Sequence, residues 1–400
     1  MIDYTIHTIQ LQDGTLCNFT KRVNTQQVTL LSTLKKVIDG RKKRGIRHQL
    51  PPVLLLLFCG ITLGATTLTD CYLFALHNRK WLESMTPLRF GIPDPTTLSR
   101  ILQKTDIDSL VHAFVYWQEQ VFGASVGTVA SFDGKTMNGC HGKTVIKHIL
   151  SLFTHDTHQI IGQIGVRQKE NEIPAFHRLL SQVGDISGML LVGDALHTQT
   201  NTIKDIRSHQ ADYLLFVKGN QEQLQTHLSL FFADLPWGKT VQHTVYEDTQ
   251  KGIRSVRTTI TLSHDQQLRD YLHGDGWEDI KTIGKVHKSG VRITTDRKET
   301  PIEETYFLIS SRFLTASKAA LHTRNHWQIE NNLHWEKDYV FLEDRQTLRL
   351  GNAPQVMSFL RSMCLSVFSG MQFSSPATAI SNFKMNTNLH HRFLKLAAVV

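Results

Sequence analysis

The chain has 400 residues, more than one ordinary hydrophobic core accommodates, so two or three domains are expected. Hydrophobic residues make up 40% and charged residues 20%, which excludes a mainly disordered chain, and 25 glycines with 10 prolines exclude a collagen-like or linker-dominated one. Lysine and arginine number 44 against 35 acidic residues, and the resulting net charge of +9 favours a polyanionic partner, nucleic acid before membrane.

The cysteines and histidines indicate neither a disulfide framework nor a zinc site. The five cysteines are scattered and form no C-x-x-C pair, which fits a reducing compartment. Among the 21 histidines, His155 and His158 have metal-ligand spacing, but no cysteine or second histidine pair completes a structural zinc set. Met1–Leu30 has no apolar run of signal-peptide length, so we expect no secretory signal.

One uncharged stretch, residues 48–69, invites comparison with a membrane span. It follows a basic run and contains Gly60 and Gly64 at the spacing of a transmembrane dimer face. However, it begins with two prolines, and its dense apolar part, Val53–Cys59, is far shorter than the roughly 20 residues needed to span a bilayer. We therefore interpret the stretch as a buried helix of a soluble domain, with a membrane protein as the distant alternative.

Residues 30–122 read as helical. Apolar residues recur at helical spacing in three segments: Leu50–Leu68, Cys71–Leu82 and Ile107–Phe122. A further helix is expected to start near Asp94. A basic tract at the front of this region, Lys35–Arg47, includes Lys42, Lys43 and Arg44. This tract is either a solvated charged face or a surface that contacts phosphates.

From Gly127 onward, strands alternate with helices, which predicts an α/β sheet. The expected strands are Gly127–Phe132, His148–Phe153, Gln159–Val166, Met189–Val192, Tyr213–Val217 and Tyr306–Ser310, and the expected helices are Ile173–Val183, Thr198–His209 and a long one from Ser317 to about Phe341. Between residues 220 and 300 the sequence is polar and its strand-like pieces alternate, which indicates an antiparallel β insertion.

Two acids occupy informative places in this pattern. Asp133 ends one apolar strand and Asp194 ends another, and the C-terminal edge of an open α/β sheet commonly holds ligands. Either residue alone is also explained as a turn or helix-capping aspartate. If the two strands are adjacent, however, both carboxylates reach one edge, where a divalent cation with oxygen ligands would neutralise them.

A third acid, Glu330, lies in a helical segment flanked by two tryptophans. On a helix, four polar residues would share its face: His326, Glu330, His334 and Lys337. A solvent-facing stripe is the alternative to a functional face.

The combined motifs resemble the transposases of the bacterial insertion-sequence family that includes the H-repeat-associated proteins of Rhs elements. The matching pieces cover roughly residues 40–365: Gly91–Pro93, Phe132–Thr136, Asn171–Pro174, Gly193–Ala195 with Gln199, Ala211–Tyr213, Lys218–Gln221, His326–Trp335, Glu343–Arg345 and Gly351–Pro354. The sequence departs from the family pattern after the first aspartate, where Met137 and Asn138 replace the more usual Leu-Arg.

The resemblance implies a catalytic domain of ribonuclease-H-like fold with the triad Asp133, Asp194 and Glu330. The expected domains are a helical, DNA-binding domain at residues 1–125, the catalytic domain at 126–375 with its β insertion at about 221–300, and a C-terminal tail at 376–400. The implied activity is DNA cleavage and joining at insertion-sequence ends by two-metal phosphoryl transfer, with Mg²⁺, or Mn²⁺ in its place, held by the triad.

The implied partners are double-stranded DNA, both element ends and target, and a second copy of the chain in the DNA complex. Candidate DNA contacts are Lys135, Lys218, His326, Lys337, Lys42, Lys43 and Arg44. We expect a bacterial cytoplasmic, nucleoid-associated protein. Two alternatives remain open: a catalytically inactive or recruited DNA-binding descendant of a transposase, and a nuclease of the same fold that joins no strands.

Overall fold

The computed structural model describes residues 4–10, 16–22, 28–123, 128–139, 146–167, 170–233, 241–248, 253–293, 299–396 and 399. The chain forms two compact units. The first unit comprises Met1–Ser125, Asp133–Gly184 and Ile329–Val400, and the second comprises Val126–Phe132 and Asp185–Gln328. Both units therefore share strand β3 (Val129–Thr136), which passes from the second to the first between Phe132 and Asp133.

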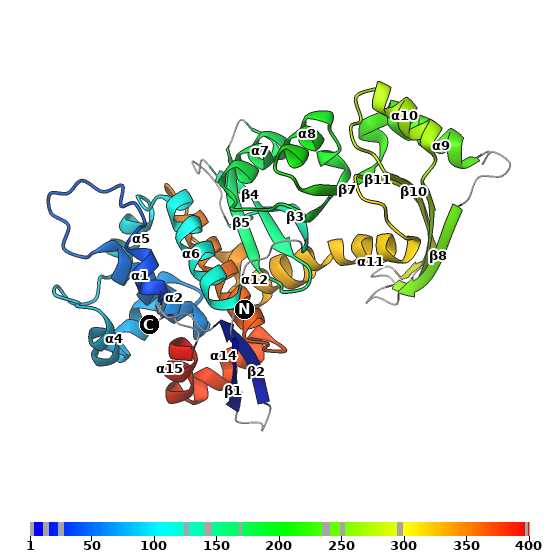
Figure 1. The fold of residues 1–400 in the computed structure, drawn as a ribbon. Helices are drawn as coiled ribbons and strands as arrows, with labels where there is room; N and C mark the ends of the chain where they lie inside the picture. Colours follow the sequence, from blue (N-terminus) through cyan, green and yellow to red (C-terminus); the bar gives the residue numbers. More distant parts are fainter. Residues whose placement is uncertain are drawn as a thin grey trace. The chain divides into compact units, whose positions relative to one another are not determined.

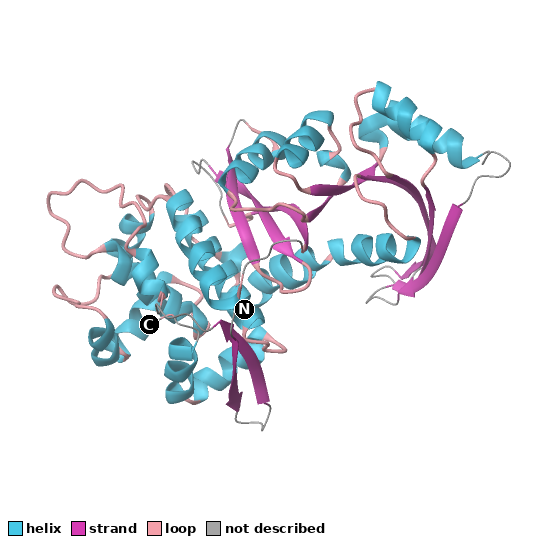
Figure 2. Ribbon diagram, viewed as in Figure 1, coloured by secondary structure: helices cyan, strands magenta, loops and turns pink. Residues whose placement is uncertain are grey.

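Helices dominate the first unit, as the sequence predicted for residues 30–122 (Figures 1 and 2). They are α1 (Leu30–Leu34), α2 (Leu50–Thr62), α3 (Leu68–His77), α4 (Arg79–Met85), α5 (Pro95–Leu102), α6 (Ile107–Phe122), α7 (Glu172–Gln182), α12 (Trp335–Phe341), α13 (Ala353–Gly370), α14 (Pro376–Met385) and α15 (Thr387–Leu396). An antiparallel hairpin, β1 (Tyr4–Gln10) and β2 (Leu16–Arg22), belongs to the same unit.

The uncharged stretch that resembled a membrane span forms α2 and the start of α3. Prolines 51 and 52 fall in the first turn of α2, where their missing N–H groups have no helical partner to lose. From Val53 to Thr62 every residue is buried, so the prediction of a buried helix is confirmed. In the described part of the chain, no helix is both long enough and apolar enough to cross a bilayer.

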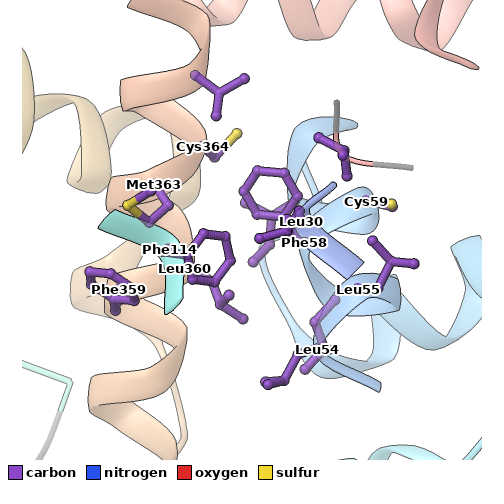
Figure 3. Packing of buried hydrophobic residues seen from close by; sticks show 14 of the residues in the cluster. Leu30, Leu54, Leu55, Phe58, Cys59, Phe114, Phe359, Leu360, Met363 and Cys364 are labelled. Carbon is purple, nitrogen blue, oxygen red and sulfur yellow. The ribbon is translucent and has the colours of Figure 1, made fainter. Parts of the chain in front are cut away.

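The core of the first unit joins segments far apart in the sequence. Figure 3 shows Phe58 of α2 and Phe114 of α6 facing Leu360 of α13, and the Phe58 and Phe114 ring centroids are 5.5 Å apart. Phe383 of α14 and Phe393 of α15 belong to the same hydrophobic cluster. Residues 376–396, expected as a tail, therefore form two helices that pack into this core, while the domain boundaries stay a prediction.

Nine strands form one mixed sheet in the order β5-β4-β3-β6-β7-β11-β10-β9-β8. Their bounds are β4 (Ile146–Thr154), β5 (Ile160–Arg167), β6 (Leu190–Gly193), β7 (Asp212–Val217), β8 (Val241–Asp248), β9 (Ile253–Ser263), β10 (Thr282–Ile293) and β11 (Glu299–Ser310). Strand β6 pairs in parallel with β3 and β7, whereas the outer strands pair antiparallel. The predicted fold class, a helical N-terminal region before a ribonuclease-H-like α/β domain, is confirmed.

The polar insertion contains the expected antiparallel strands and, in addition, two helices. Strands β8 to β10 accompany α9 (Glu222–Ala233) and α10 (Gln266–Gly274). The buried residues of α9, Leu224, Leu228 and Phe232, recur at helical spacing, so the sequence did carry a signal for this helix that the prediction of an all-β insertion missed. Apolar residues four apart are the pattern typical of a helix with one buried face.

The single long helix predicted from Ser317 to about Phe341 is divided into three parts. It consists of α11 (Ala316–His326), a π-helical segment η3 (Ile329–His334) and α12. Apolar periodicity does not distinguish a π-helical turn from an α-helical one, so the sequence could not reveal the change. Short π-helical segments often mark functional sites because they reorient side chains.

A buried ion network ties α12 to α13 in the first unit. Lys337 is fully buried, and its Nζ lies 3.0 Å from Oε1 of Glu343 and donates a hydrogen bond to Ser358 at 2.8 Å. Arg361 approaches the other carboxylate oxygen of Glu343 at 3.4 Å and donates to the carbonyl of Thr66 at 2.9 Å. Because Lys337 lies in this interior network, the expectation that it contacts DNA phosphates is wrong.

The network also determines how its carboxylate titrates. Burial alone would raise the pKa of Glu343, but Lys337 and Arg361 outweigh burial and lower that pKa to about 2. Burial disfavours the charged form of Lys337 and so lowers its pKa, whereas the negative charge of Glu343 opposes that shift. A carboxyl whose pKa is depressed in the folded chain stabilises the fold above its ordinary pKa of 4.5 and loses that effect as the pH falls toward 2.

We predict that Glu343→Gln lowers the free energy of unfolding by about 3–5 kcal/mol at pH 7, because two buried cations lose their anion. Urea unfolding followed by circular dichroism at several pH values measures the difference from the unaltered chain. The difference should narrow as the pH falls below 4.5, since the unaltered Glu343 then loses its own contribution. Glu83→Gln, at an exposed pair with Arg79, should change stability little. A difference independent of pH would contradict the account.

Candidate active site

The two aspartates follow paired residues on neighbouring parallel strands. The register of β3 and β6 pairs Phe132 with Gly193, and the next residues along the two strands are Asp133 and Asp194. Asp194 is exposed, and its Oδ1 accepts a hydrogen bond from the N–H of Ala195 at 2.7 Å. The prediction that the two strands are adjacent is confirmed, and Asp194 follows the end of β6 as expected. Asp133, however, does not end its strand, because β3 continues to Thr136.

Gly193 is explained by the same pairing. A Cβ atom on Gly193 would stand 2.1 Å from the Cζ atom of the Phe132 ring, so only glycine allows the ring to cross the neighbouring strand there. The ring is fully buried and packs edge-to-face on His197, with centroids 4.8 Å apart. The Gly-Asp motif therefore combines a packing requirement at Gly193 with an exposed carboxylate at Asp194.

Glu330 lies on the π-helical segment η3 and is exposed. On the same segment His334 is 7% exposed, and its Nδ1 lies 3.5 Å from Oδ2 of Asp133. Burial, followed by the nearby Lys337 and Lys135, lowers the pKa of His334 to about 3, so its imidazole is neutral at pH 7. Within the first unit, η3 thus carries Glu330 and, through His334, also contacts Asp133.

His326 does not share the face predicted for it. It ends α11 in the second unit, where its Nδ1 lies 3.1 Å from Oγ of Ser131 and its ring packs edge-to-face on Phe216. Burial lowers the pKa of His326 to about 4, despite the opposing charge of Asp194. The ring is 7% exposed, so the structure gives the predicted DNA contact of His326 no support, and that contact stays a prediction.

Lys135 is also committed to partners inside the protein. Its side chain is 9% exposed, and its Nζ lies 2.5 Å from Oδ2 of Asp338 and 3.7 Å from Oδ1 of Asp344. Burial raises the pKa of Asp338, and the hydrogen bond and charge of Lys135 oppose that shift. Lys135 therefore fastens β3 to α12 and the following turn, rather than presenting its charge to a DNA backbone as the sequence suggested.

A histidine and a glutamate that the sequence analysis did not single out as site residues flank the next part of β3. Nε2 of His148 lies 2.6 Å from Oε1 of Glu172, and its Nδ1 lies 3.0 Å from Oγ1 of Thr136. A Cβ on Gly134 would stand 2.1 Å from that Nε2 and 2.4 Å from that Oε1. Each residue of the Asp-Gly-Lys-Thr motif thus has its own role. Asp133 is the candidate acid, and Gly134 leaves room for the His148–Glu172 pair. Lys135 forms the ion pair with Asp338, and Thr136 contacts His148 through its hydroxyl.

The remaining predicted DNA contacts are exposed cations. Lys218 lies 3.6 Å from Glu304, with its Nζ 5.4 Å from the centroid of the Tyr306 ring. Lys42, Lys43 and Arg44 occupy an exposed loop. Arg41 closes this loop: its Nη2 lies 2.6 Å from Oδ2 of Asp39 and donates to the carbonyl of His48 at 2.8 Å. The loop therefore presents three cations from an anchored base.

The residues expected to hold a metal ion have suitable chemistry, since all three are carboxylates and hard divalent cations prefer oxygen ligands. The side chains of Asp194 and Glu330 are exposed, and that of Asp133 is 35% exposed. Among the described residues, however, no group of three or more histidine, cysteine, aspartate or glutamate side chains is gathered closely enough to hold one ion. The donor atoms are of the kind that a divalent cation prefers, and we propose below that they bind one together.

The contacts around β3 predict a specific coupling. Gly134→Ala should displace the His148–Glu172 pair and lower the free energy of unfolding by about 1–3 kcal/mol, as overpacking does. His148→Ala in the same chain removes the obstructing ring, so the double variant should lose less stability than the sum of the two single variants. Urea unfolding of the four chains gives this coupling energy. Strict additivity would show that Gly134 and His148 do not meet.

Comparison with known proteins identifies the family. Residues 116–367, more than half of the chain, match the family described as "Transposase DDE domain", and residues 31–118 match one described as "DDE_Tnp_1-associated". Relatives include "H repeat-associated putative transposase YhhI" and "Putative protein YbfL" of Escherichia coli (strain K12), each 29% identical over 345 residues, or 85% of this chain and 90% of the relative.

Another relative is "Putative transposase YncI" of Escherichia coli O157:H7, 27% identical over 343 residues, which cover 85% of this chain and 87% of that protein. The match over residues 116–367 spans both predicted aspartates and Glu330. The family resemblance inferred from the motifs is confirmed, and the chain belongs to the transposase DDE-domain family.

Proposed function

We propose that the chain is a DNA transposase that cleaves and joins DNA strands at the ends of an insertion sequence, with Asp133, Asp194 and Glu330 as its catalytic acids. The observation that carries the proposal is the β3–β6 register, because the two aspartates are the residues that directly follow its last pair, Phe132 and Gly193. The contact of His334 with Asp133 supports Glu330 as the third acid, because Glu330 and His334 lie on the same short segment, η3.

The proposed reaction consists of two phosphoryl transfers. First, a water oxygen bonds to the phosphorus at the element end as the bond from phosphorus to the 3′ oxygen breaks, which leaves a 3′-OH and a 5′-phosphate. That 3′-OH then attacks a target phosphodiester and displaces the target's own 3′ oxygen, so the number of phosphodiester bonds is conserved. Divalent ions such as Mg²⁺ or Mn²⁺, when bound by the three acids, would activate the attacking oxygen and stabilise the leaving one.

The protein's own part is to hold these acids while excluding competing cations from them. Lys135 is two residues after Asp133, but its charge is neutralised by its ion pair with Asp338. Lys337, seven residues after Glu330, is neutralised by Glu343 in the interior. Both lysines therefore stabilise the scaffold around the acids, and DNA phosphates are left to exposed cations such as Lys218 and the loop Lys42–Arg44.

The same proposal has consequences for partners and location. Joining two element ends to one target requires both ends in a single complex, so we infer at least two copies of the chain on the DNA. Its substrate, bacterial chromosomal DNA, would place the protein in the cytoplasm with the nucleoid.

Asp194→Asn should abolish strand cleavage while retaining DNA binding, because it removes a charge from the site and leaves the shape unchanged. The assay uses labelled duplex from the DNA that flanks the coding sequence, with Mg²⁺ or Mn²⁺, and gel shifts with EDTA measure binding. Asp270→Asn, at an exposed aspartate of α10, is the matched control and should cleave normally. Cleavage by the Asp194 variant would refute the triad. DNA binding without cleavage by the unaltered chain would favour the inactive DNA-binding alternative.

The exposed loop gives an independent prediction about DNA affinity. Replacing Lys42, Lys43 and Arg44 by glutamine should weaken DNA binding and make it less dependent on salt. Each lost phosphate contact reduces the magnitude of the negative slope of log K against log salt concentration by about 0.9. Fluorescence anisotropy at several salt concentrations measures this slope.

A charge-matched control separates a local contact from the effect of net charge. Glutamine at three dispersed, exposed lysines removes the same charge from other surfaces: Lys80, Lys318 and Lys395. An equal loss of affinity and slope in both triple variants would contradict a specific role for the loop.

A further inference from the structure

His334 occupies an unusual place for a histidine beside a candidate metal ligand. Its Nδ1 lies 3.5 Å from Oδ2 of Asp133, whose side chain is 35% exposed, while His334 itself is buried. Its other ring nitrogen, Nε2, is also buried and has no hydrogen-bond partner among the residues that the structure describes. The polar contact of this ring is therefore directed at the first acid of the proposed triad.

The position of His334 is fixed by the segment that carries it. On η3, Glu330 is exposed whereas Ile329, Leu333 and His334 are buried. Ile329 and Leu333 belong to the hydrophobic cluster of the first unit, so packing holds the segment on both sides of the glutamate. The ring consequently cannot follow the Asp133 side chain if that side chain rotates.

One nitrogen of the ring faces a polar group, which determines what the ring can donate. Only an N–H on Nδ1 can donate toward the carboxylate oxygen of Asp133, because Nδ1 is the ring nitrogen that lies 3.5 Å from it. Nε2 is buried and has no hydrogen-bond partner among the described residues, so the contact with Asp133 is the polar contact that the structure shows for this ring. Carboxylates that bind metal ions are commonly oriented by such outer hydrogen bonds, and losing one weakens metal affinity or activity by about 10- to 100-fold.

We propose that His334 is a positioning residue, which holds the Asp133 carboxylate in the orientation needed for a divalent cation and so sets the affinity for that cation. The inference rests on the proposed function, because it takes Asp133 to be a metal ligand. His334 does not itself bind the cation or the DNA. Its effect should therefore appear in metal affinity and leave metal-free DNA binding unchanged.

Two polar substitutions separate positioning from a merely structural role. In His334→Asn the amide nitrogen takes the place of Nδ1 and keeps the donor, whereas in His334→Gln it takes the place of Nε2 and moves the donor away from Asp133. Both variants keep a polar amide in the cavity, and both should be compared for stability by urea unfolding. Trp335→Leu, at an exposed neighbour, serves as the control for the helix.

The measurement is the binding of Mn²⁺ to the full, DNA-free chain, followed by electron paramagnetic resonance of the free ion. We expect His334→Gln to weaken Mn²⁺ binding by about 10- to 100-fold, with His334→Asn and Trp335→Leu close to the unaltered chain. The Mg²⁺ concentration for half-maximal cleavage should rise by a similar factor, with the rate recovered at saturating Mg²⁺.

The Asp133→Asn variant distinguishes failure of this inference from failure of the proposed function. If Asp133→Asn weakens Mn²⁺ binding and His334→Gln does not, the positioning role is overturned and the proposed triad stands. Equal losses in the Asn and Gln variants would likewise overturn it, since the place of the donor would not matter. If Asp133→Asn leaves Mn²⁺ binding unchanged, both the inference and the assignment of Asp133 fail.

Discussion

The parallel pairing of β3 with β6 is the constraint on which the rest of the proposed site depends. It sets Phe132 opposite Gly193, and the absence of a side chain on Gly193 lets the Phe132 ring cross the neighbouring strand. The two residues that follow are the exposed or half-exposed aspartates. A shift of one residue in this register would turn a side chain to the opposite face of the sheet and separate the acids from their supports.

Past that pair, β3 is held through each successive residue of its motif. His334 contacts Asp133, the His148–Glu172 pair fills the space beside Gly134, and Lys135 is bound by Asp338. The nearby cations are thus paired with acids inside the protein rather than with the acids of the proposed site. This arrangement explains how a chain with a surplus of positive charge leaves Asp133 and Asp194 accessible to an external cation.

Local patterns predicted the strands, the aspartate that follows β6 and the buried α2 helix, because strand periodicity and the absence of charge are properties of short segments. They placed the end of β3 too early, before Asp133, because the polar residues Asp133–Thr136 give no apolar signal although they continue the strand. The partners of Lys135 and Lys337 were not predictable in the same way. Asp338 lies 203 residues from Lys135 in the chain, and no periodicity marks a salt bridge across such a separation. Glu343 is close to Lys337 in the sequence, but the two face one another only because the chain turns after α12. Glu172 and Glu343 lay within recognised motifs, yet His148 and Arg361 gave no signal before their contacts were seen.

The central claim is that Asp133, Asp194 and Glu330 act together on metal ions at a DNA strand. Anomalous diffraction at the manganese edge, from crystals of the chain bound to element-end DNA and soaked in Mn²⁺, tests it most directly. The account predicts two peaks about 3.5–4 Å apart, each coordinated by carboxylate oxygens of these residues and by the phosphate to be cleaved. Peaks held by other side chains, or an occupied DNA site without bound manganese, would contradict it.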